Sequence, residues 1–324
     1  MIKLNWQKLN EQKKEYLKNI KPKTFIVAMS EIDDETLKKI AKDEKETYIW
    51  GAVEEEWFDG LENSEHFRPL SEQKIENKLN KNFPDSANHA ILSYQKSNLK
   101  YLISELKPEK IIWIYGTWSR VLHYREEWWK GYEYGAEQIS ISPFASEKSA
   151  KDYSEKVSKR SRKEFEEKWI EKSRIGMNQK EIWEFLIDLE SLSWDWTGRS
   201  SACITAKCNN GKYSVLGYGY NRVLPYEGYM LYEGSLREKN HTPVGQNLEY
   251  GETVHAEIDA LLMCNLAGAK ITDSILWTSK FCCPYCARSF AASPISAIFY
   301  RDEYTNDLSY SVLRAAGKVI KKVL

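Results

Sequence analysis

Short apolar runs alternate with polar and helical stretches over roughly the first 145 residues. Residues 1 to about 20 predict a polar helix or arm. Residues 90–94 predict either a strand or the start of the helix that continues to Leu106. The runs that predict buried strands are Thr24–Met29, Thr47–Val53, Ile111–Gly116 and Gln138–Pro143. Strands separated by helical stretches indicate an α/β layer domain.

Residues 145–175 are rich in Lys, Arg and Glu, with Phe165 and Trp169 four positions apart. This pattern predicts an exposed amphipathic helix that connects two domains. Its basic cluster, residues 159–163, would either contact phosphates or form a solvated face. We favour the solvated face because acidic residues follow.

The pattern changes again after residue 178. Apolar residues recur at helical spacing from about Gln179, and a hairpin is predicted across Asn209-Asn210-Gly211, a favoured turn sequence. Further strands are expected near 273–279, 296–301 and 318–323, with helices between them. We therefore expect an α/β domain at 1–145, a helical connector at 146–177 and a second α/β domain at 178–324.

Candidate chemistry lies in the third part of the chain. His255-Ala256-Glu257 is followed by Cys283-Pro284-Tyr285-Cys286. His255, Cys283 and Cys286 are three good zinc ligands, and a hydrolytic zinc keeps its fourth position for water. Glu257 would lie beside the metal as a proton carrier. A redox pair or half of a zinc ribbon is less suitable, because no second C-x-x-C is present and the histidine comes with its glutamate.

Other segments extend this pattern. Gly219-Tyr220-Asn221 follows the predicted hairpin, and the tail contains Ile298–Tyr304 and then Leu313-Arg314-Ala315-Ala316-Gly317. With the metal motif, these segments resemble the zinc-dependent cytidine/deoxycytidylate deaminase family, and its deoxycytidylate (dCMP) branch most closely. The resemblance covers residues from about 178 to the end. It implies a three-layer α/β/α domain with a five-stranded mixed sheet, preceded here by a separate α/β domain.

The resemblance also implies a reaction. Zinc hydroxide would attack C4 of a cytosine ring, and Glu257 would protonate N3 and then the leaving amine. Asn221 would bind near the sugar, and the backbone of Ala256 would hold the base edge. Tyr285, or an aromatic residue of the 227–250 loop, would pack on the base. Candidate phosphate ligands are Arg199, Arg222 and Arg237, each of which is also readily explained as an ordinary surface arginine.

Two features qualify this picture. The family usually has proline before the first cysteine, where this chain has Cys282, so Cys282, Cys283 and Cys286 leave the register open. Only Cys283 and Cys286 keep the two-residue gap. The long segment between Asn221 and His255 contains several prolines and glycines, and we expect it to close over the substrate as a lid.

Composition limits the partners. Lys plus Arg and Asp plus Glu both number 47, and the pI is about 7.0, which argues against a broad nucleic-acid surface but not against a local patch. Phosphate-loop and dinucleotide-binding motifs are absent. All six cysteines lie beyond residue 200, and no apolar stretch approaches a membrane span. We therefore expect a cytoplasmic protein that does not bind membranes.

Three hypotheses follow. The first is an enzyme acting on a free deoxycytidine nucleotide, dCMP or dCTP, with Zn²⁺ as cofactor; the resemblance adds a homo-oligomer. The second is a deaminase of cytosine in a polynucleotide or of tRNA adenine, with the first half as a nucleic-acid platform. The third is a zinc-bound regulatory protein without turnover, which would not need Glu257. Aromatic residues of the first half could stack on bases but more often pack in a core. They are Trp113, Tyr115, Trp118, Tyr124, Trp128, Trp129, Tyr132 and Tyr134.

Overall fold

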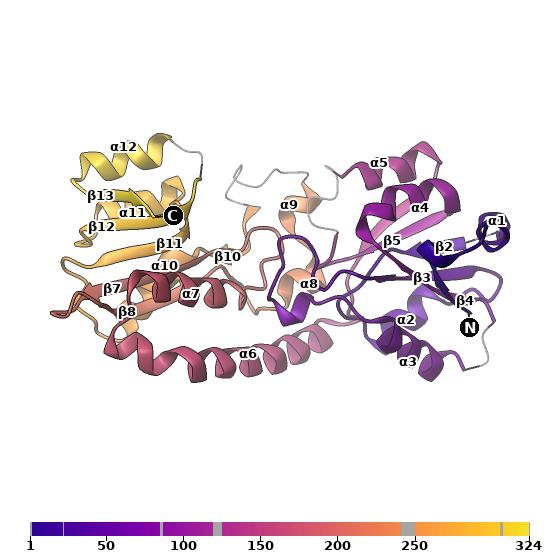
Figure 1. Ribbon diagram of the computed structural model, residues 1–324, viewed down its shortest axis with the longest axis horizontal. Helices are drawn as coiled ribbons and strands as arrows, with labels where there is room; N and C mark the ends of the chain where they lie inside the picture. The colour runs from indigo at the N-terminus through magenta and orange to yellow at the C-terminus, as the bar shows by residue number, and fades with distance from the viewer. Residues whose placement is uncertain are drawn as a thin grey trace. The chain divides into compact units, whose positions relative to one another are not determined.

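The computed structural model describes residues 2–21, 23–84, 87–118, 125–240, 250–304 and 307–323 (Figure 1). Tyr124 lies outside these residues. The chain divides into two compact units. The N-terminal unit comprises Met1–Tyr153 and Gly228–Gly251, and the C-terminal unit comprises Ser154–Glu227 and Glu252–Leu324.

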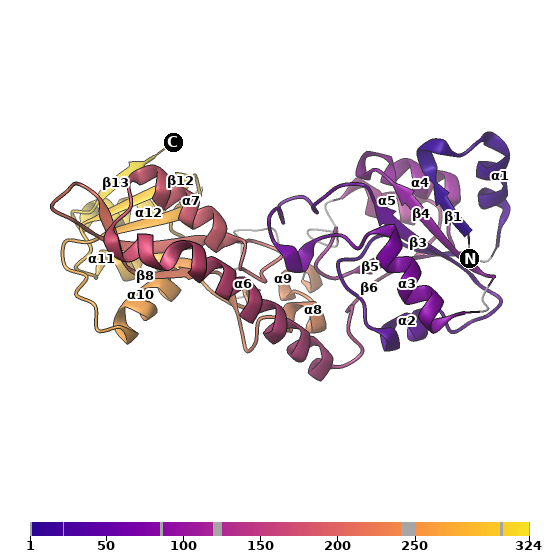
Figure 2. The same ribbon diagram turned by 60° about the horizontal axis from the view of Figure 1, so that its bottom comes forward.

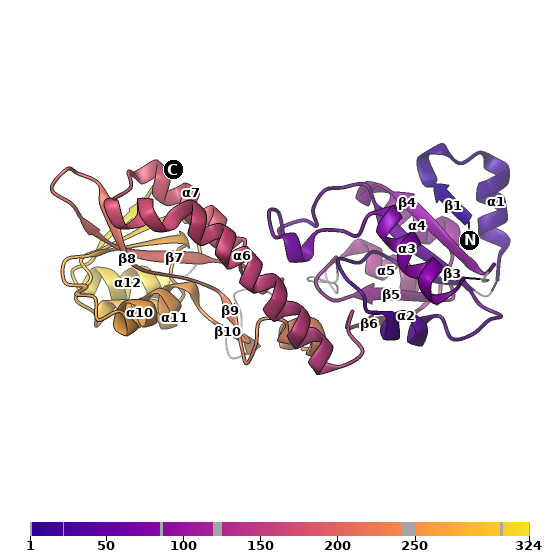
Figure 3. The same ribbon diagram turned by 90° about the horizontal axis from the view of Figure 1, so that it is seen from below.

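The described part of the N-terminal unit contains a six-stranded parallel sheet in the order β1-β4-β3-β2-β5-β6. Helices cover it on both faces, with α2 and α3 on the same one (Figures 2 and 3). The order reverses between β2 and β5, as in doubly wound sheets. The strands are β1 Ile2–Asn5, β2 Lys23–Ile26, β3 Thr47–Val53, β4 His89–Tyr94, β5 Lys110–Ile114 and β6 Glu137–Ile141. The helices are α1 Glu11–Asn19, α2 Asp34–Ile40, α3 Glu72–Asn82, α4 Leu99–Leu106 and α5 Glu126–Glu133.

Two sequence-based expectations for this unit need correction or completion. The first 20 residues are not only a helix or arm, because β1 precedes α1 and pairs with β4. A four-residue strand that alternates polar and apolar residues without a turn signal is too short to show a period. Residues 90–94 form a strand, since β4 is buried along its length between β1 and β3.

The segment expected to be a lid contributes to the N-terminal unit. Its described part contains α8 (Tyr229–Glu233) and α9 (Leu236–Lys239), which group with the N-terminal unit. A Cβ on Gly234 would lie 2.6 Å from Cζ of Tyr115, so only glycine allows this close approach to the end of β5. Met230 and Leu231 are fully buried. Residues 241–249 lie outside the described part, so a lid role for them stays a prediction.

The described part of the C-terminal unit contains a five-stranded mixed sheet in the order β13-β12-β11-β7-β8. The β7–β8 and β7–β11 pairs are antiparallel, whereas β11, β12 and β13 run parallel. The strands are β7 Ser201–Lys207, β8 Tyr213–Tyr220, β11 Ile275–Lys280, β12 Ala297–Asp302 and β13 Val319–Lys322. The predicted fold class is therefore confirmed: an α/β chain with a parallel sheet followed by a mixed five-stranded sheet.

Helices pack on both faces of this second sheet. On one face, α7 (Gln179–Glu190) covers Cys203 and Trp277. On the other, α10 (Ala256–Leu266) lies against β8, where a Cβ on Gly219 would come within 2.5 Å of Ala260 N. Remaining elements of this unit are β9 Arg222–Val223, β10 Thr253–Val254, α11 Pro284–Ala291 and α12 Asp307–Ala315. The close approach of β8 and α10 fixes the start of the helix that follows His255.

The charged helix α6 (Glu147–Ile175) differs from the expected connector. Phe165 and Trp169 are buried in one apolar cluster with Phe185 and Leu186 of α7. Trp169 also donates a hydrogen bond from Nε1 to Asp188 Oδ2 at 2.7 Å. Most of α6 thus belongs to the C-terminal unit, so that unit begins near residue 154 rather than 178. Among the described helices, none is both long and apolar enough to cross a membrane.

Candidate metal centre

His255 is the residue that caps the N-terminus of α10. Its backbone is extended (φ −65°, ψ 144°), and the short strand β10 leads into it. Ala256, Ala260 and Cys264 of this helix face the interior, whereas its apolar residues Leu262 and Leu266 are 43% and 81% exposed. Packing of one face of α10 therefore places the imidazole at the start of a half-buried helix.

Cys283 and Cys286 occupy the start of α11. Cys283 is the N-cap, Pro284 is in the first turn, and the Cys283 sulfur accepts a hydrogen bond from the Cys286 backbone N–H at 3.5 Å. Proline suits this position because its missing N–H would be unpaired there. The partial positive charge at a helix N-terminus favours thiolates.

The two segments meet at the histidine. Cys283 Sγ lies 3.3 Å from His255 Nδ1, and Cys286 Sγ lies 3.5 Å from the same nitrogen. The three candidate ligand atoms are all within 4.8 Å of one another. Within the described residues, no other group of three His, Cys, Asp or Glu side chains has this arrangement. One imidazole nitrogen and two sulfurs are a donor set that suits Zn²⁺, and three protein ligands leave a position open.

The protonation of these groups fits a metal site. A hydrogen bond from Cys286, helped by His255, lowers the pKa of Cys283 to about 4. The same bond raises the pKa of Cys286, and the bond to Cys283 raises the pKa of His255. Without a metal, Cys283 is therefore the thiolate, and Cys286 and His255 carry the protons that hydrogen-bond to it. Metal ligands must be deprotonated, so binding of a cation would release these protons.

Glu257 lies in the first turn of α10, two residues after His255, and is 5% exposed. Burial raises its pKa, although the positive charge of His255 opposes this effect. A carboxyl group with a raised pKa holds a proton more readily than an ordinary glutamate and can release it again, which is the property of a general acid and base.

Cys282 is fully buried beside this site but lies outside the ligand group. Burial first, and then the negative charge of Glu257, raise its pKa. A thiol of this kind stays protonated and is a poor metal ligand. The geometry thus favours the register in which Cys283 and Cys286 are the ligands.

Asn221 links the metal helix to the neighbouring strand. Its Oδ1 accepts a hydrogen bond from the Ala256 backbone N–H at 3.0 Å, and its Nδ2 donates to Gly198 O at 2.5 Å. Both expected substrate ligands are therefore adjacent to the histidine and to each other. Because the Ala256 N–H is already used, its contact with a base edge, like that of Asn221 with a sugar, stays a prediction.

The other expected substrate ligands are spread more widely. Arg222 donates from Nε and Nη2 to Asp259 Oδ1 at 3.0 and 2.8 Å, so it is paired with α10. Arg199 is half-buried, and its carbonyl accepts a hydrogen bond from Lys280 Nζ. Tyr285 is 58% exposed beneath the Arg288 guanidinium. Arg237 belongs to the N-terminal unit. The structure thus gathers Asn221, Ala256 and Arg222 around the start of α10.

Sequence reasoning missed the turn that holds Asn221. Asp195 is 5% exposed, and its Oδ1 accepts hydrogen bonds from the backbone N–H groups of Thr197 and Gly198 and from the Thr197 hydroxyl. Its Oδ2 lies 3.4 Å from Asn221 Nδ2. Asp followed by Thr and Gly is a recognisable turn signal, but nothing local connects it to a residue 26 positions later.

Comparison with known proteins gives partial matches. No protein-family model matches the chain. It is 24% identical to ComE operon protein 2 of Bacillus subtilis (strain 168) over 110 residues, which are 34% of this chain and 54% of that protein. The chain therefore spans about half the length of that relative.

Similar solved structures are deaminases. The dCMP deaminase from cyanophage S-TIM5 is 22% identical, with 45% of this chain and 99% of that chain covered and a TM-score of 0.31. A diaminohydroxyphosphoribosylaminopyrimidine deaminase/reductase from Thermotoga maritima is 15% identical (38% and 29% covered, TM-score 0.25). A structure from work on tRNA:A34 deaminases is 14% identical (38% and 76% covered, TM-score 0.23). Their named substrates differ, so these similarities do not distinguish one substrate from another.

Proposed function

We propose that this protein is a hydrolytic deaminase that converts the cytosine base of a free deoxycytidine nucleotide, dCMP or dCTP, to uracil. The observation that carries the proposal is the grouping of His255 Nδ1 with the sulfurs of Cys283 and Cys286, next to a buried glutamate on the same helix. A purely structural metal site has no use for such a proton carrier.

His255, Cys283 and Cys286 would hold Zn²⁺. Bound there, zinc would supply the Lewis acidity that lowers the pKa of water toward neutrality. Cysteine and histidine together suit zinc better than the hard cations Mg²⁺ and Ca²⁺, which prefer oxygen ligands.

Glu257 would move the protons. It takes a proton from the attacking water and delivers it to ring nitrogen N3 as a C–O bond forms at C4. The proton of the new C4 hydroxyl would then pass through Glu257 to the exocyclic amine, the C–N bond would break as the C4=O double bond forms, and ammonia would leave. Its raised pKa supports both steps, because the carboxyl group must accept a proton and donate it within one cycle.

Neighbouring residues would position the nucleotide. Asn221 is held rigidly by Gly198 and Ala256, so it can present its remaining acceptor capacity near the sugar. Arg222 and Arg199 are candidate phosphate partners. Arg222 would have to share its guanidinium between a phosphate and Asp259. The proposal does not choose between dCMP, with one phosphate, and dCTP, with three. It also includes self-assembly of the protein into a homo-oligomer.

A second candidate is deamination of a polynucleotide. Trp129 and Tyr132 of α5 are 56% and 55% exposed, and such rings can stack on bases. Nearby Lys100 and Lys130, however, pair with Glu126 and Glu133, so this face carries little excess positive charge. We rank the free nucleotide first for this reason.

The decisive experiment measures ammonia release and product identity with zinc-loaded protein. Substrates are dCMP, dCTP, deoxycytidine and a cytosine-containing single strand. We expect turnover of a free nucleotide that falls at least about a hundredfold in Glu257→Gln. Glu184→Gln, an exposed change on α7, is the matched control and retains full activity.

Other outcomes would redirect the proposal. Turnover of the strand alone would favour the polynucleotide candidate. Zinc binding at one equivalent without turnover of any of the four would favour a regulatory zinc protein. Undiminished turnover in Glu257→Gln would contradict the assigned proton carrier.

A further inference from the structure

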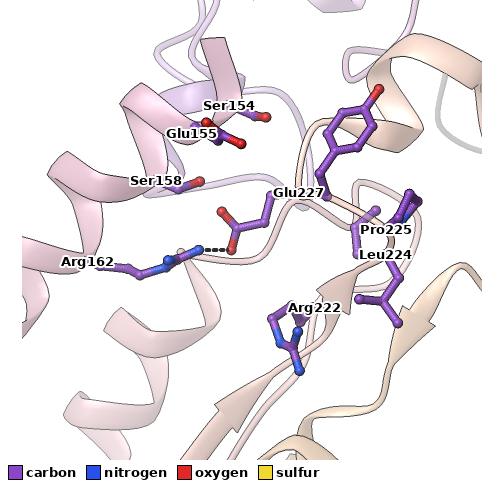
Figure 4. Close-up of a pocket in the computed structure, with 10 residues that line it drawn as sticks. Ser154, Glu155, Ser158, Arg162, Arg222, Leu224, Pro225 and Glu227 are labelled. Atoms are coloured by element: carbon purple, nitrogen blue, oxygen red, sulfur yellow. Dashed lines mark hydrogen bonds and ion pairs between the residues drawn. The ribbon is translucent and has the colours of Figure 1, made fainter. Parts of the chain in front are cut away.

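A cavity lies within the C-terminal unit, and none of the metal ligands lines it. Its volume is about 270 Å³. One wall is a stripe of α6 that includes Ser158 and Arg162, and the other is residues 222–227, which follow Asn221 directly (Figure 4). Every lining residue belongs to the C-terminal unit. The metal centre described above uses none of the α6 residues.

The floor of this cavity is a rigid polar network. Arg162 donates from Nη2 to Glu227 Oε1 at 2.5 Å and from Nε to the Tyr220 hydroxyl at 3.3 Å. The same hydroxyl donates to Glu227 Oε1 at 2.7 Å. Tyr220 is 6% exposed, and burial raises its pKa, so it keeps its proton. The Glu227 carboxylate is thereby fixed, pointing across the cavity toward α6 (Figure 4).

Two polar atoms of the lining are left without a protein partner. Both hydrogen bonds to Glu227 go to Oε1, and Oε2 has none among the described residues. Ser158 is 5% exposed, and its hydroxyl also has no hydrogen-bond partner in the described part of the chain. A buried hydroxyl is costly to leave unpaired, so Ser158 calls for a hydrogen-bond partner from outside the protein, and Glu227 Oε2 can accept a hydrogen bond from the same partner.

The charges of the lining decide which kind of donor fits. Arg162 is neutralised by Glu227, Arg222 is neutralised by Asp259, and the exposed Glu155 of the lining adds a negative charge that disfavours an anion. A ligand phosphate would have to displace one of these carboxylates, and an ammonium group would lie beside the Arg162 guanidinium. Neutral groups that both donate and accept hydrogen bonds meet neither problem. Hydroxyl groups have this property, and carboxylate, guanidinium and serine side chains together match them.

We infer that this cavity is a binding site for an uncharged molecule rich in hydroxyl groups, of the size of a ribose or a small nucleoside. Its hydroxyls donate to Glu227 Oε2 and exchange hydrogen bonds with Ser158. The apolar side chains of Val223 and Leu224 cover its less polar face. The cavity volume is below the usual range for drug-sized ligands, which supports a small occupant.

Occupancy of the cavity reaches the metal centre through two short links. Residues 222–227 follow Asn221, whose side chain accepts a hydrogen bond from the Ala256 backbone. The first of them, Arg222, is paired with Asp259, one turn further along α10. A ligand that stiffens this wall therefore alters substrate binding rather than the chemical step. This coupling rests on the proposed function, whereas binding to the cavity does not.

Isothermal titration of the full-length, zinc-loaded protein tests the site. The probes are D-ribose and adenosine, with 1,4-diaminobutane and inorganic phosphate as charged counterparts. We expect saturable binding of a hydroxylated probe at one site. Ser158→Leu, which fills the cavity, weakens this binding about tenfold or more, and Ser158→Ala weakens it severalfold. Ser161→Leu on the same helix lies outside the lining and has no effect.

Several results would overturn the inference. The first is that neither hydroxylated probe binds saturably. The second is that a probe binds but Ser158→Leu and Ser158→Ala leave its affinity unchanged. The third is that diaminobutane or phosphate binds instead, in a manner that depends on Ser158. If Ser158→Leu fails to fold, the Ser158→Ala titration still decides.

The coupling to the metal centre is tested by steady-state kinetics. We expect the bound probe to change KM for the nucleotide at least twofold with kcat unchanged. An unchanged KM refutes the coupling alone, and an inactive enzyme leaves the binding result intact.

Discussion

Adjacent cysteines can have different chemical roles, and Cys282 and Cys283 show how small the structural difference is. Both are buried, but only the Cys283 sulfur lies beside His255 Nδ1 and accepts a backbone N–H at the start of α11. That N–H and the imidazole stabilise a thiolate at Cys283. At Cys282, burial and then the negative charge of Glu257 raise the pKa instead, so the protonated thiol is favoured.

Zinc content distinguishes these two residues. We expect Cys283→Ala to lose most of its zinc, because two ligands hold the metal far less tightly than three. Cys282→Ala is the matched control and should retain close to one equivalent. Metal analysis of the purified variants, with folding checked by circular dichroism, gives the answer. Full zinc in Cys283→Ala with loss in Cys282→Ala would reverse the assigned register.

At the scale of elements, the structure joins β3 and β4 through a buried histidine. The Trp50 indole donates from Nε1 to His89 Nδ1 at 3.0 Å, and the two rings are stacked. His89 is 3% exposed, and burial lowers its pKa to about 4. Because Nδ1 accepts this bond, protonation of His89 would break it.

This arrangement makes the stability of the N-terminal unit depend on pH. The pKa of His89 is about 4 in the folded chain and near 6.5 in the unfolded chain. Between these values the unfolded chain binds a proton that the folded chain does not. The stabilisation is therefore complete above pH 6.5 and is lost as pH falls toward 4. Between pH 7 and 5 the free energy of unfolding should fall by about 2 kcal/mol on this account.

Denaturant unfolding at pH 7 and pH 5 measures this effect. Carboxylates titrate over the same range, so the comparison is with His89→Gln, which keeps an acceptor but cannot be protonated. We expect the wild-type protein to lose about 2 kcal/mol more than this variant over the two pH units. Equal losses in both proteins would show that His89 does not control the pH dependence.

Elements with a clear period or turn signal were predictable, whereas those defined by distant partners were not. The β7–β8 hairpin follows from Asn209-Asn210-Gly211, and α7 follows from its apolar spacing. Strand β1 could not be predicted, because it pairs with β4, almost ninety residues later. The same reason hid the contacts of the metal centre: the H-x-E and C-x-x-C motifs are local, but the Asp195–Asn221–Ala256 links join three separate segments.

At the scale of the whole molecule, the chain does not divide at one point. It passes between the two units after Tyr153, after Glu227 and after Gly251. Composition suggested a charged linker near 146–177, since α6 is rich in Lys and Glu. Its buried Phe165 and Trp169 instead anchor most of it within the C-terminal unit. Composition gave no sign that the insertion at 228–251 belongs to the N-terminal unit, because Tyr115 and Gly116, which contact its described part, lie more than a hundred residues earlier.

This interleaving predicts how a shortened protein behaves. A fragment that begins at Ser154 keeps the second sheet and the metal ligands but removes Tyr115 and Gly116, which follow β5 and contact the insertion. Met230 and Leu231, which are fully buried in the complete chain, would become exposed in it. We expect this fragment to aggregate, because the exposed apolar side chains of α8 would seek another partner.

Replacing residues 229–250 of the fragment by a short Gly-Ser linker removes these apolar side chains and should restore a well-behaved domain. Size-exclusion chromatography with light scattering, together with zinc analysis, compares the two fragments. We expect a defined species with one zinc per chain only for the fragment with the linker. If both fragments are equally well behaved, the insertion does not depend on the N-terminal unit. If neither folds, the N-terminal unit is needed for more than covering α8, and the metal helix requires the complete chain.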